Sequence, residues 1–141
     1  MSLVLLDTNL ASALYRGDQE RLETYADVLV PGPLAIALQS SAEMRYGAER
    51  ARWGIPKRNR LEVMLARLIV LTPDQTTAHR WAQVMAHAER IGRPLSHGDG
   101  WIAAAAIQNG TTLVSHDLDL ADLGFPGLEV VCRARPGNPG G

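Results

Sequence analysis

The feature that most constrains the fold is a short apolar run near the start of the chain that ends in polar residues. Residues 3–6 read Leu-Val-Leu-Leu, and Asp7, Thr8 and Asn9 follow directly. An unbroken apolar run of this length is typical of a strand that is buried on both faces of a parallel sheet. In such sheets, ligands bind beyond the carboxyl ends of the strands. The run therefore places Asp7 where a carboxylate can face a pocket.

Strand and helix patterns alternate along the rest of the chain. After the first strand, four further strands are expected at residues 34–38, 68–71, 112–114 and 128–131. Helical patterns that end at glycine or proline separate them, and this alternation predicts one α/β domain with a central, mainly parallel twisted sheet flanked by helices. We expect this domain to span residues 1–132 and the proline- and glycine-rich residues 133–141 to form a disordered C-terminal tail.

Composition excludes several classes of protein. With 141 residues, 46% of them hydrophobic, the chain suits one globular domain, and its net charge of −1 provides no overall attraction for nucleic acid. The single cysteine, Cys132, excludes an internal disulfide and a multi-cysteine zinc site, which suits a reduced, cytoplasmic setting. We find neither a basic leader with an apolar core nor an apolar run approaching 18 residues, so we expect neither secretion nor a membrane span.

Two acids near the predicted strand ends have structural interpretations as well as functional ones. Asp7 could simply cap the helix that follows the first strand. Glu43 stands three residues after Ser40, which is the spacing of a capping box. An ionised carboxylate has about four acceptor sites, so a capping glutamate could still bind a metal ion.

Three more acids follow later in the chain. Asp99 is expected in the first turn of a helix, where the helix dipole favours a negative charge, while Gly98 and Gly100 leave room for something to approach. Asp117 ends a predicted strand, where an aspartate often begins a turn. Asp119 either shares the face of Asp117 or caps the short turn that follows, and we favour the cap.

The main acids converge when the topology is considered. In a doubly wound sheet, one edge receives four of them: Asp7, Glu43, Asp99 and Asp117. Carboxylates brought together without a counter-charge repel one another. Lys57 is far from all four in the sequence, and only Arg45 is close to one of them. Oxygen ligands select hard divalent cations, so the sequence predicts a Mg²⁺ or Mn²⁺ site at this edge.

Other classes that place an aspartate after a strand fit less well. A haloacid-dehalogenase-type phosphatase needs a second acid at the position of Asn9. A phosphoacceptor receiver domain uses a lysine at a strand end, whereas Lys57 stands in a polar, helical context beside a proline. A nucleotide-binding switch needs a phosphate loop, and no Gly-x-x-x-x-Gly-Lys pattern is present.

Four segments that combine acids with apolar residues follow one another along the chain: LLDTN at 5–9, SAEMRYG at 41–47, DGWIAAAA at 99–106 and TLVSHD at 112–117. In this order they resemble the motifs of PIN-domain ribonucleases, and among them most of all the VapC toxins of bacterial toxin–antitoxin pairs. The resemblance covers residues 3 to about 131. It implies that the four acids form the catalytic and metal-binding set and that Asp119 is an auxiliary metal ligand. It also implies that the acids and a water are oriented by neighbouring polar residues, namely Thr8, Asn9 and Ser115.

The resemblance implies a function as well. A PIN-domain toxin of this kind would be a Mg²⁺-dependent endoribonuclease that hydrolyses RNA by a metal-activated water. Its partners would be RNA, a small VapB-like antitoxin whose C-terminal part blocks the acids, and a second copy of the chain in a homodimer. The alternative is a catalytically weak PIN-like module that acts by sequestering RNA.

A basic segment offers a second functional surface. Between residues 43 and 67, seven positive residues stand against three negative ones. The candidates for RNA phosphate contacts are Arg45, Arg50, Arg52, Lys57, Arg58 and Arg60. A solvated helical face explains the same pattern equally well, and a basic face could also bind an acidic antitoxin.

Overall fold

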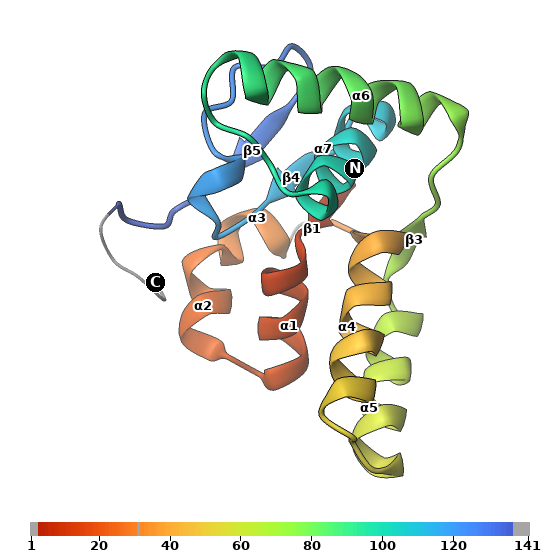
Figure 1. Ribbon diagram of the computed structural model, residues 1–141. Coiled ribbons are helices and arrows are strands. Elements are labelled where there is room, and N and C mark those ends of the chain that lie inside the picture. The colour runs from red at the N-terminus through yellow and green to blue at the C-terminus, as the bar shows by residue number, and fades with distance from the viewer. Residues whose placement is uncertain (1–2, 31, 137–141) are drawn as a thin grey trace.

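A five-stranded sheet forms the centre of the molecule (Figure 1). The computed structural model describes residues 3–30 and 32–136. All strands of the sheet pair in parallel, in the order β3-β2-β1-β4-β5. The strands are β1 (Val4–Leu6), β2 (Leu34–Ala37), β3 (Ile69–Leu71), β4 (Thr112–Val114) and β5 (Glu129–Val131). The predicted α/β fold with a mainly parallel sheet is confirmed.

Helices cover both faces of the sheet (Figure 1). One group consists of α1 (Thr8–Arg16), α2 (Gln19–Thr24), α3 (Ala26–Leu29), α4 (Leu38–Arg50) and α5 (Ile55–Ala66). The other consists of α6 (Gln75–Arg90) and α7 (His97–Asn109), and a single 3₁₀ turn, η1 (Leu118–Leu120), follows β4. In the part of the chain that the structure describes, no helix is both long enough and apolar enough to cross a membrane.

The period-2 alternation of the strands separates two hydrophobic cores. On β1, Leu5 faces the core that includes Val84 of α6 and Ile102 of α7. Leu6 faces the opposite core, with Leu10 of α1 and Leu61 of α5. Burying both faces of β1 explains why its sequence is continuously apolar. The sheet is therefore fixed from both sides, which gives its carboxyl edge a rigid base.

The polar residues after β1 and β4 continue the ladder beyond the strands. The Asp7 N–H donates to the Val114 carbonyl at 3.1 Å, and the Ser115 N–H donates to the Val131 carbonyl at 3.1 Å. Asp7 and Ser115 therefore start from backbone positions that the sheet itself determines.

Several expected boundaries differ from the structure. The strands expected at 68–71 and 128–131 each begin one residue later, at Ile69 and Glu129. The predicted strand 34–38 ends at Ala37, and α4 begins at Leu38 without an intervening loop. The sequence pattern also predicts an alanine-rich helix over residues 101–109, and in the structure this helix begins earlier, at His97, after the N-cap Ser96. Apolar Leu38 suits both a strand and a helix, so its sequence did not mark the boundary.

The start of the expected C-terminal tail has defined contacts. The Arg133 guanidinium donates to both carboxylate oxygens of Asp27, at 2.6 and 3.0 Å, and to the Thr24 carbonyl at 2.6 Å. Residues 137–141 of that expected tail lie outside the described residues.

Candidate metal centre

Asp7 caps α1 from the end of β1, as its structural interpretation proposed. Its Oδ1 accepts a hydrogen bond from the Leu10 N–H at 2.9 Å, and the Ser115 hydroxyl donates to its Oδ2. With the Asn9 amide oriented so that its nitrogen faces Asp7, that nitrogen lies 2.7 and 2.9 Å from the two carboxylate oxygens. Asn9 and Ser115 thus fix the orientation of the Asp7 carboxylate, a role that the resemblance implied for them.

The electrostatic setting of Asp7 is unfavourable for a negative charge. Only 3% of the residue is exposed. Burial raises the pKa of Asp7 from 3.8 to about 6, and the charges of Asp117 and Asp99 add to the rise against the opposing bonds from Ser115 and Leu10. A cap at a helix start does not require this burial beside two other acids.

Glu43 extends from the second turn of α4 and does not belong to a capping box. Ser40 lies inside the helix, whose N-cap is Ala37, so the expected Ser40–Glu43 box is wrong. The Thr8 hydroxyl donates to Glu43 Oε2 at 2.7 Å, and the Gln39 amide nitrogen donates to Oε1 at 3.3 Å. Thr8 therefore orients Glu43 rather than Asp7.

Asp99 lies in the first turn of α7. Its N–H donates to the hydroxyl of the N-cap Ser96 at 3.1 Å. Burial and the neighbouring charges of Asp117, Asp119 and Glu43 together raise the pKa of Asp99 from 3.8 to about 6, against the lowering effect of the hydrogen bond with Ser96. The predicted acids therefore lie close enough together for their charges to raise the pKa values of Asp7 and Asp99.

The two glycines beside Asp99 make room for protein side chains. A Cβ at Gly98 would lie 2.7 Å from Glu43 Oε1. A Cβ at Gly100 would lie 2.5 Å from Met85 Sδ and 2.9 Å from Trp81 Nε1. Gly98 thus lets α7 approach the Glu43 carboxylate, whereas Gly100 serves the packing of α7 on α6.

Asp117 and Asp119 lie at the start of η1, after β4. Asp117 is the N-cap of this turn, and its Oδ1 accepts a hydrogen bond from the Asp119 N–H at 2.9 Å. The capping role favoured for Asp119 is therefore wrong and belongs to Asp117. The Asp117 N–H in turn donates to the Ser115 hydroxyl at 3.0 Å, which links this turn to Asp7.

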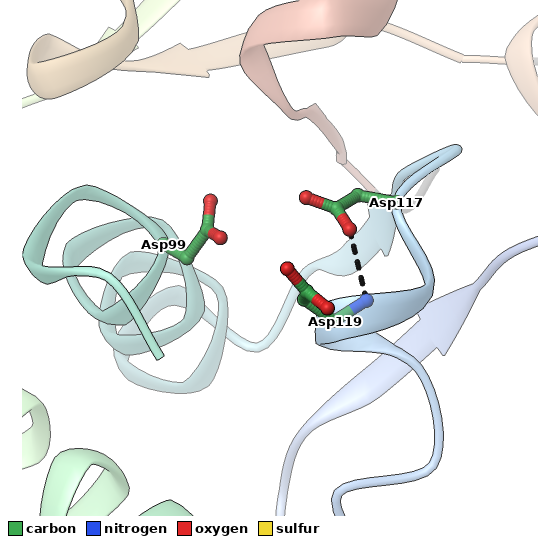
Figure 2. Close-up of side chains that lie close together, drawn as sticks. All are labelled: Asp99, Asp117 and Asp119. Atoms are coloured by element: carbon green, nitrogen blue, oxygen red, sulfur yellow. Dashed lines mark hydrogen bonds between the residues drawn. The ribbon is translucent and has the colours of Figure 1, made fainter. Parts of the chain in front are cut away.

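Three carboxylates converge between α7 and η1 (Figure 2). Asp99, Asp117 and Asp119 each place one oxygen within 4.8 Å of the others. Asp7 and Glu43 are outside this group of three, although their charges act on its members. The structure thus brings Asp119, ranked as auxiliary from the sequence, into the centre of the cluster.

This donor set suits a hard divalent cation. All of the groups are carboxylate oxygens, which Mg²⁺ and Mn²⁺ prefer. Two of the acids, Asp7 and Asp99, have pKa values raised to about 6 by burial and by their acidic neighbours. A cation among them would offset the repulsion that raises these values. The residues present therefore fit the metal that the sequence predicts.

The basic candidates lie on the hairpin formed by α4 and α5 and on the turn between these helices, which projects away from the sheet (Figure 1). Two of them are paired: Arg45 binds Glu62 through two hydrogen bonds of 2.9 and 3.0 Å, and Arg58 binds Glu49 at 2.5 Å. The four remaining candidates are exposed, namely Arg50, Arg52, Lys57 and Arg60.

Two of the candidates contact aromatic rings. Lys57 Nζ lies 5.7 Å from the centre of the Trp53 ring, and the Arg60 guanidinium lies 5.6 Å from that of Tyr15. The structure thus groups the basic residues on one projecting element but partly neutralises them within it.

Two polar residues of the site were not among the sequence candidates. Ser96 caps the helix of Asp99, and the spacing Ser96-x-x-Asp99 is a helix-start signal that could have identified it. Gln39 contacts Glu43 from the preceding turn of α4, and finding it requires knowing that α4 begins at Leu38.

Comparison with known proteins gives a consistent family. The family model described as PIN domain matches residues 4–126. Toxin FitB of Neisseria gonorrhoeae is 30% identical over 122 residues, which are 82% of this chain and 88% of that protein. Ribonuclease VapC5 of Mycobacterium tuberculosis is 28% identical over 130 residues, 90% of this chain and 93% of that protein.

A solved structure agrees in fold over nearly the whole chain. The crystal structure of VapBC-5 from Mycobacterium tuberculosis, a member of the VapBC family of toxin–antitoxin systems, matches with a TM-score of 0.72 and 26% identity. The match covers 94% of this chain and 100% of that chain. Since the family model matches most of the chain, including the segments that contain all five acids, this chain belongs to the PIN domain family.

Proposed function

We propose that this protein is a divalent-metal-dependent endoribonuclease and the toxin of a toxin–antitoxin pair. The observation that supports this most directly is the convergence of Asp99, Asp117 and Asp119 at the carboxyl edge of the sheet. Relatives named as a ribonuclease and a toxin, each aligned over more than four fifths of this chain, point to the same activity.

Each acid has a role that its surroundings suggest. Asp99, Asp117 and Asp119 would hold one Mg²⁺ or Mn²⁺, and Asp7 would complete the set from the buried side. Such a cation lowers the pKa of a bound water and stabilises charge on the leaving oxygen of a phosphodiester. Glu43, oriented by Thr8 and Gln39, keeps further acceptor capacity on both oxygens and would accept a proton from the attacking water.

A cleavage assay tests this proposal. The purified chain is incubated with end-labelled single-stranded RNA and Mg²⁺, with EDTA and the Asp99→Asn variant as controls. We expect products with 5′-phosphate and 3′-hydroxyl ends, no cleavage in EDTA, and a rate for Asp99→Asn reduced by at least about 10²–10³-fold, because several kcal/mol of electrostatic stabilisation is lost. RNA binding without cleavage in either Mg²⁺ or Mn²⁺ would favour RNA sequestration instead.

The proposed partner is a small antitoxin, because the related VapBC-5 structure belongs to a toxin–antitoxin system. A short reading frame found directly upstream of this gene would be the candidate antitoxin, and its co-expression is expected to give a stable complex whose RNA cleavage is suppressed. Light scattering on the same samples measures whether the chain forms the homodimer that the resemblance implies. Full cleavage activity in a purified complex would contradict inhibition by that partner.

A further inference from the structure

The three converging acids come from two separate segments of the chain. Asp99 lies at the start of α7, whereas Asp117 and Asp119 lie in residues 115–122, which we call the acidic loop. Oxygens must stand at defined distances from one another to bind one small cation, and Mg²⁺ demands near-ideal geometry. The groups that fix the acidic loop relative to the rest of the molecule therefore control the geometry of the site.

Arg93 binds the C-terminal part of the acidic loop, from Leu118 to Asp122. It lies between α6 and α7, six residues before Asp99. Its guanidinium donates to the carbonyls of Leu118 at 2.8 Å, Asp122 at 3.1 Å and Asp119 at 3.4 Å. A planar guanidinium can bind three carbonyls at once because its donors form a rigid fork. One side chain thus connects the segment that leads into Asp99 with the turn that contains Asp119.

The conformation of the loop explains why such a contact is needed. Asp122 adopts a left-handed backbone conformation with φ of 55°, which is uncommon for a residue other than glycine. Arg93 binds the carbonyl of this same residue. The contact stabilises a loop conformation that is less common than the right-handed one even for aspartate, which adopts it more readily than most residues.

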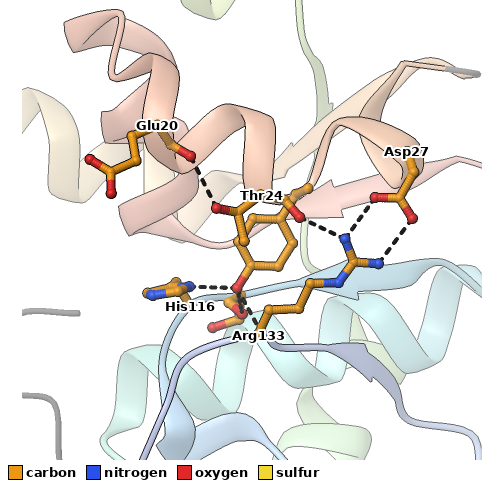
Figure 3. Close-up of polar contacts among 7 residues, drawn as sticks. Glu20, Thr24, Asp27, His116 and Arg133 are labelled. Atoms are coloured by element: carbon orange, nitrogen blue, oxygen red, sulfur yellow. Dashed lines mark hydrogen bonds and ion pairs between the residues drawn. The ribbon is translucent and has the colours of Figure 1, made fainter.

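The Tyr25 hydroxyl binds the N-terminal part of the acidic loop, at Ser115 and His116; Figure 3 labels His116 and the nearby Arg133. Tyr25 is fully buried, and its hydroxyl lies 2.5 Å from His116 Nδ1 and 3.3 Å from the Ser115 carbonyl. The Arg133 N–H donates to the same oxygen at 2.8 Å. A phenol has one donor and two acceptor positions, so these three partners use its whole hydrogen-bonding capacity.

We propose that Arg93 and Tyr25 are positioning residues that hold the acidic loop at the distance from Asp99 that divalent-cation binding requires. Neither residue belongs to the acid set. Arg93 acts through the backbone at Leu118, Asp119 and Asp122, and Tyr25 acts through Ser115 and His116. The inference rests on the proposed metal site. It adds two residues to that site, and they lie 25 to 91 positions away in the sequence from the groups they bind.

The experiment compares metal affinity with fold stability in the full chain. Arg93→Met keeps the aliphatic stem and removes the donors, Arg93→Lys keeps the charge without the fork, and Tyr25→Phe removes only the hydroxyl. The matched control is Arg90→Met, because Arg90 is an exposed arginine at the end of α6. The Mn²⁺ dissociation constant is measured by titration calorimetry, and the melting temperature is measured in EDTA.

Removal of partners that orient metal ligands typically costs 10–100-fold in affinity. We therefore expect Arg93→Met to weaken Mn²⁺ binding by at least about tenfold, with a smaller loss in Tyr25→Phe, partial recovery in Arg93→Lys and no change in Arg90→Met. If Arg93→Met does not fold, Arg93→Lys and Tyr25→Phe make the same comparison.

The outcomes separate this inference from the proposed function. Unchanged Mn²⁺ affinity in folded Arg93 and Tyr25 variants, with only the melting temperature lowered, would show that both residues are purely structural and would overturn the inference. A wild-type chain that binds Mn²⁺ but cleaves no RNA would contradict the ribonuclease activity while the affinity losses still supported the inference. A wild-type chain that binds no Mn²⁺ would overturn both.

Discussion

The acidic edge of the sheet and the α4–α5 hairpin both concentrate charge, but the protein compensates that charge in only one of them. At the edge, burial and acidic neighbours raise the pKa values of Asp7 and Asp99 to about 6. On the hairpin, the bidentate contact with Arg45 lowers the pKa of Glu62. The ionised form of an acidic side chain is therefore destabilised at the edge and stabilised on the hairpin.

This difference separates a region with uncompensated charge from one that contains its own counter-charges. Buried like charges reduce the stability of a fold, so their accumulation at one edge marks that edge as a candidate functional site. Exposed pairs such as Arg45–Glu62 contribute at most about 1 kcal/mol and are screened by salt. The acids at the edge could bind a cation from outside the chain, whereas the hairpin supplies its own counter-charges.

The largest effect that we predict is a pH dependence of stability with opposite signs in the two regions. Asp7, with its pKa raised to about 6 from 3.8, stabilises the fold below about pH 4, and that contribution is lost as the pH rises through 6. This rise of the Asp7 pKa corresponds to about 3 kcal/mol in the free energy of unfolding. Glu62, with a lowered pKa, stabilises the fold above about pH 4.5 and loses this contribution as the pH falls.

Urea unfolding in EDTA from pH 4 to pH 8 measures both effects. Asp7→Asn keeps an acceptor for the Leu10 N–H, so it serves as the matched variant. The free energy of unfolding of the wild type is expected to fall relative to Asp7→Asn between pH 4 and pH 7, and to rise relative to Glu62→Gln. If the free energies of unfolding of the wild type and of Asp7→Asn change with pH in the same way, the negative charge of Asp7 is already compensated within the chain.

The second prediction concerns divalent cations. At a Mg²⁺ or Mn²⁺ concentration 100 times the dissociation constant, the free energy of unfolding at pH 7.5 is expected to rise by about 2.7 kcal/mol. The gain should be smaller at pH 5, because protons compete for Asp7 and Asp99. Thermal unfolding with and without metal measures it. Asp99→Asn should lose most of the gain and Glu62→Gln should keep it; equal gains would place the cation elsewhere.

The third prediction compares one glycine from each region. A Cβ at Gly47 of α4 meets nothing within 4 Å, so Gly47→Ala is expected to stabilise the protein by about 0.5–1 kcal/mol. Gly98→Ala offers a similar helix-propensity gain, but its Cβ would displace the Glu43 carboxylate. We expect cleavage by Gly98→Ala to fall by about tenfold or more without a lower melting temperature. Unchanged cleavage would show that the position of Glu43 is not critical.

The sequence predicted the residues whose positions follow from the strands. Asp7 and Asp117 end apolar runs, and the carboxyl ends of parallel strands share one edge, so their convergence follows from the topology. Local helix signals were less decisive. Because α4 follows β2 without a loop, Ser40 lies inside the helix, and the capping box suggested by the spacing of Ser40 and Glu43 does not form.

Contacts between distant segments could not be predicted from one sequence. Arg93 is an ordinary polar loop residue in the sequence, and its partners lie 25 to 29 residues away. Arg45 and Glu62 likewise pair across two helices that are separated by a turn. Such contacts depend on how complete elements pack together, which neither propensity nor local spacing encodes.

The smallest predicted effect tests the hairpin as an RNA-binding surface. Glu62→Gln is expected to change the free energy of unfolding by no more than about 0.5 kcal/mol, because the pair with Arg45 is exposed. The freed Arg45 should bind one more phosphate, which makes the slope of log affinity against log salt concentration steeper by about 0.7 for single-stranded RNA.

Fluorescence anisotropy in an Asp99→Asn background measures RNA binding without cleavage. Glu129→Gln is the matched control, because it removes the same charge from the exposed first residue of β5 without releasing an arginine of the hairpin. A steeper slope in Glu62→Gln alone would identify the hairpin as a phosphate-binding face. The same slope in both variants would leave it a solvated helical surface, since only the overall charge of the protein would then matter to RNA.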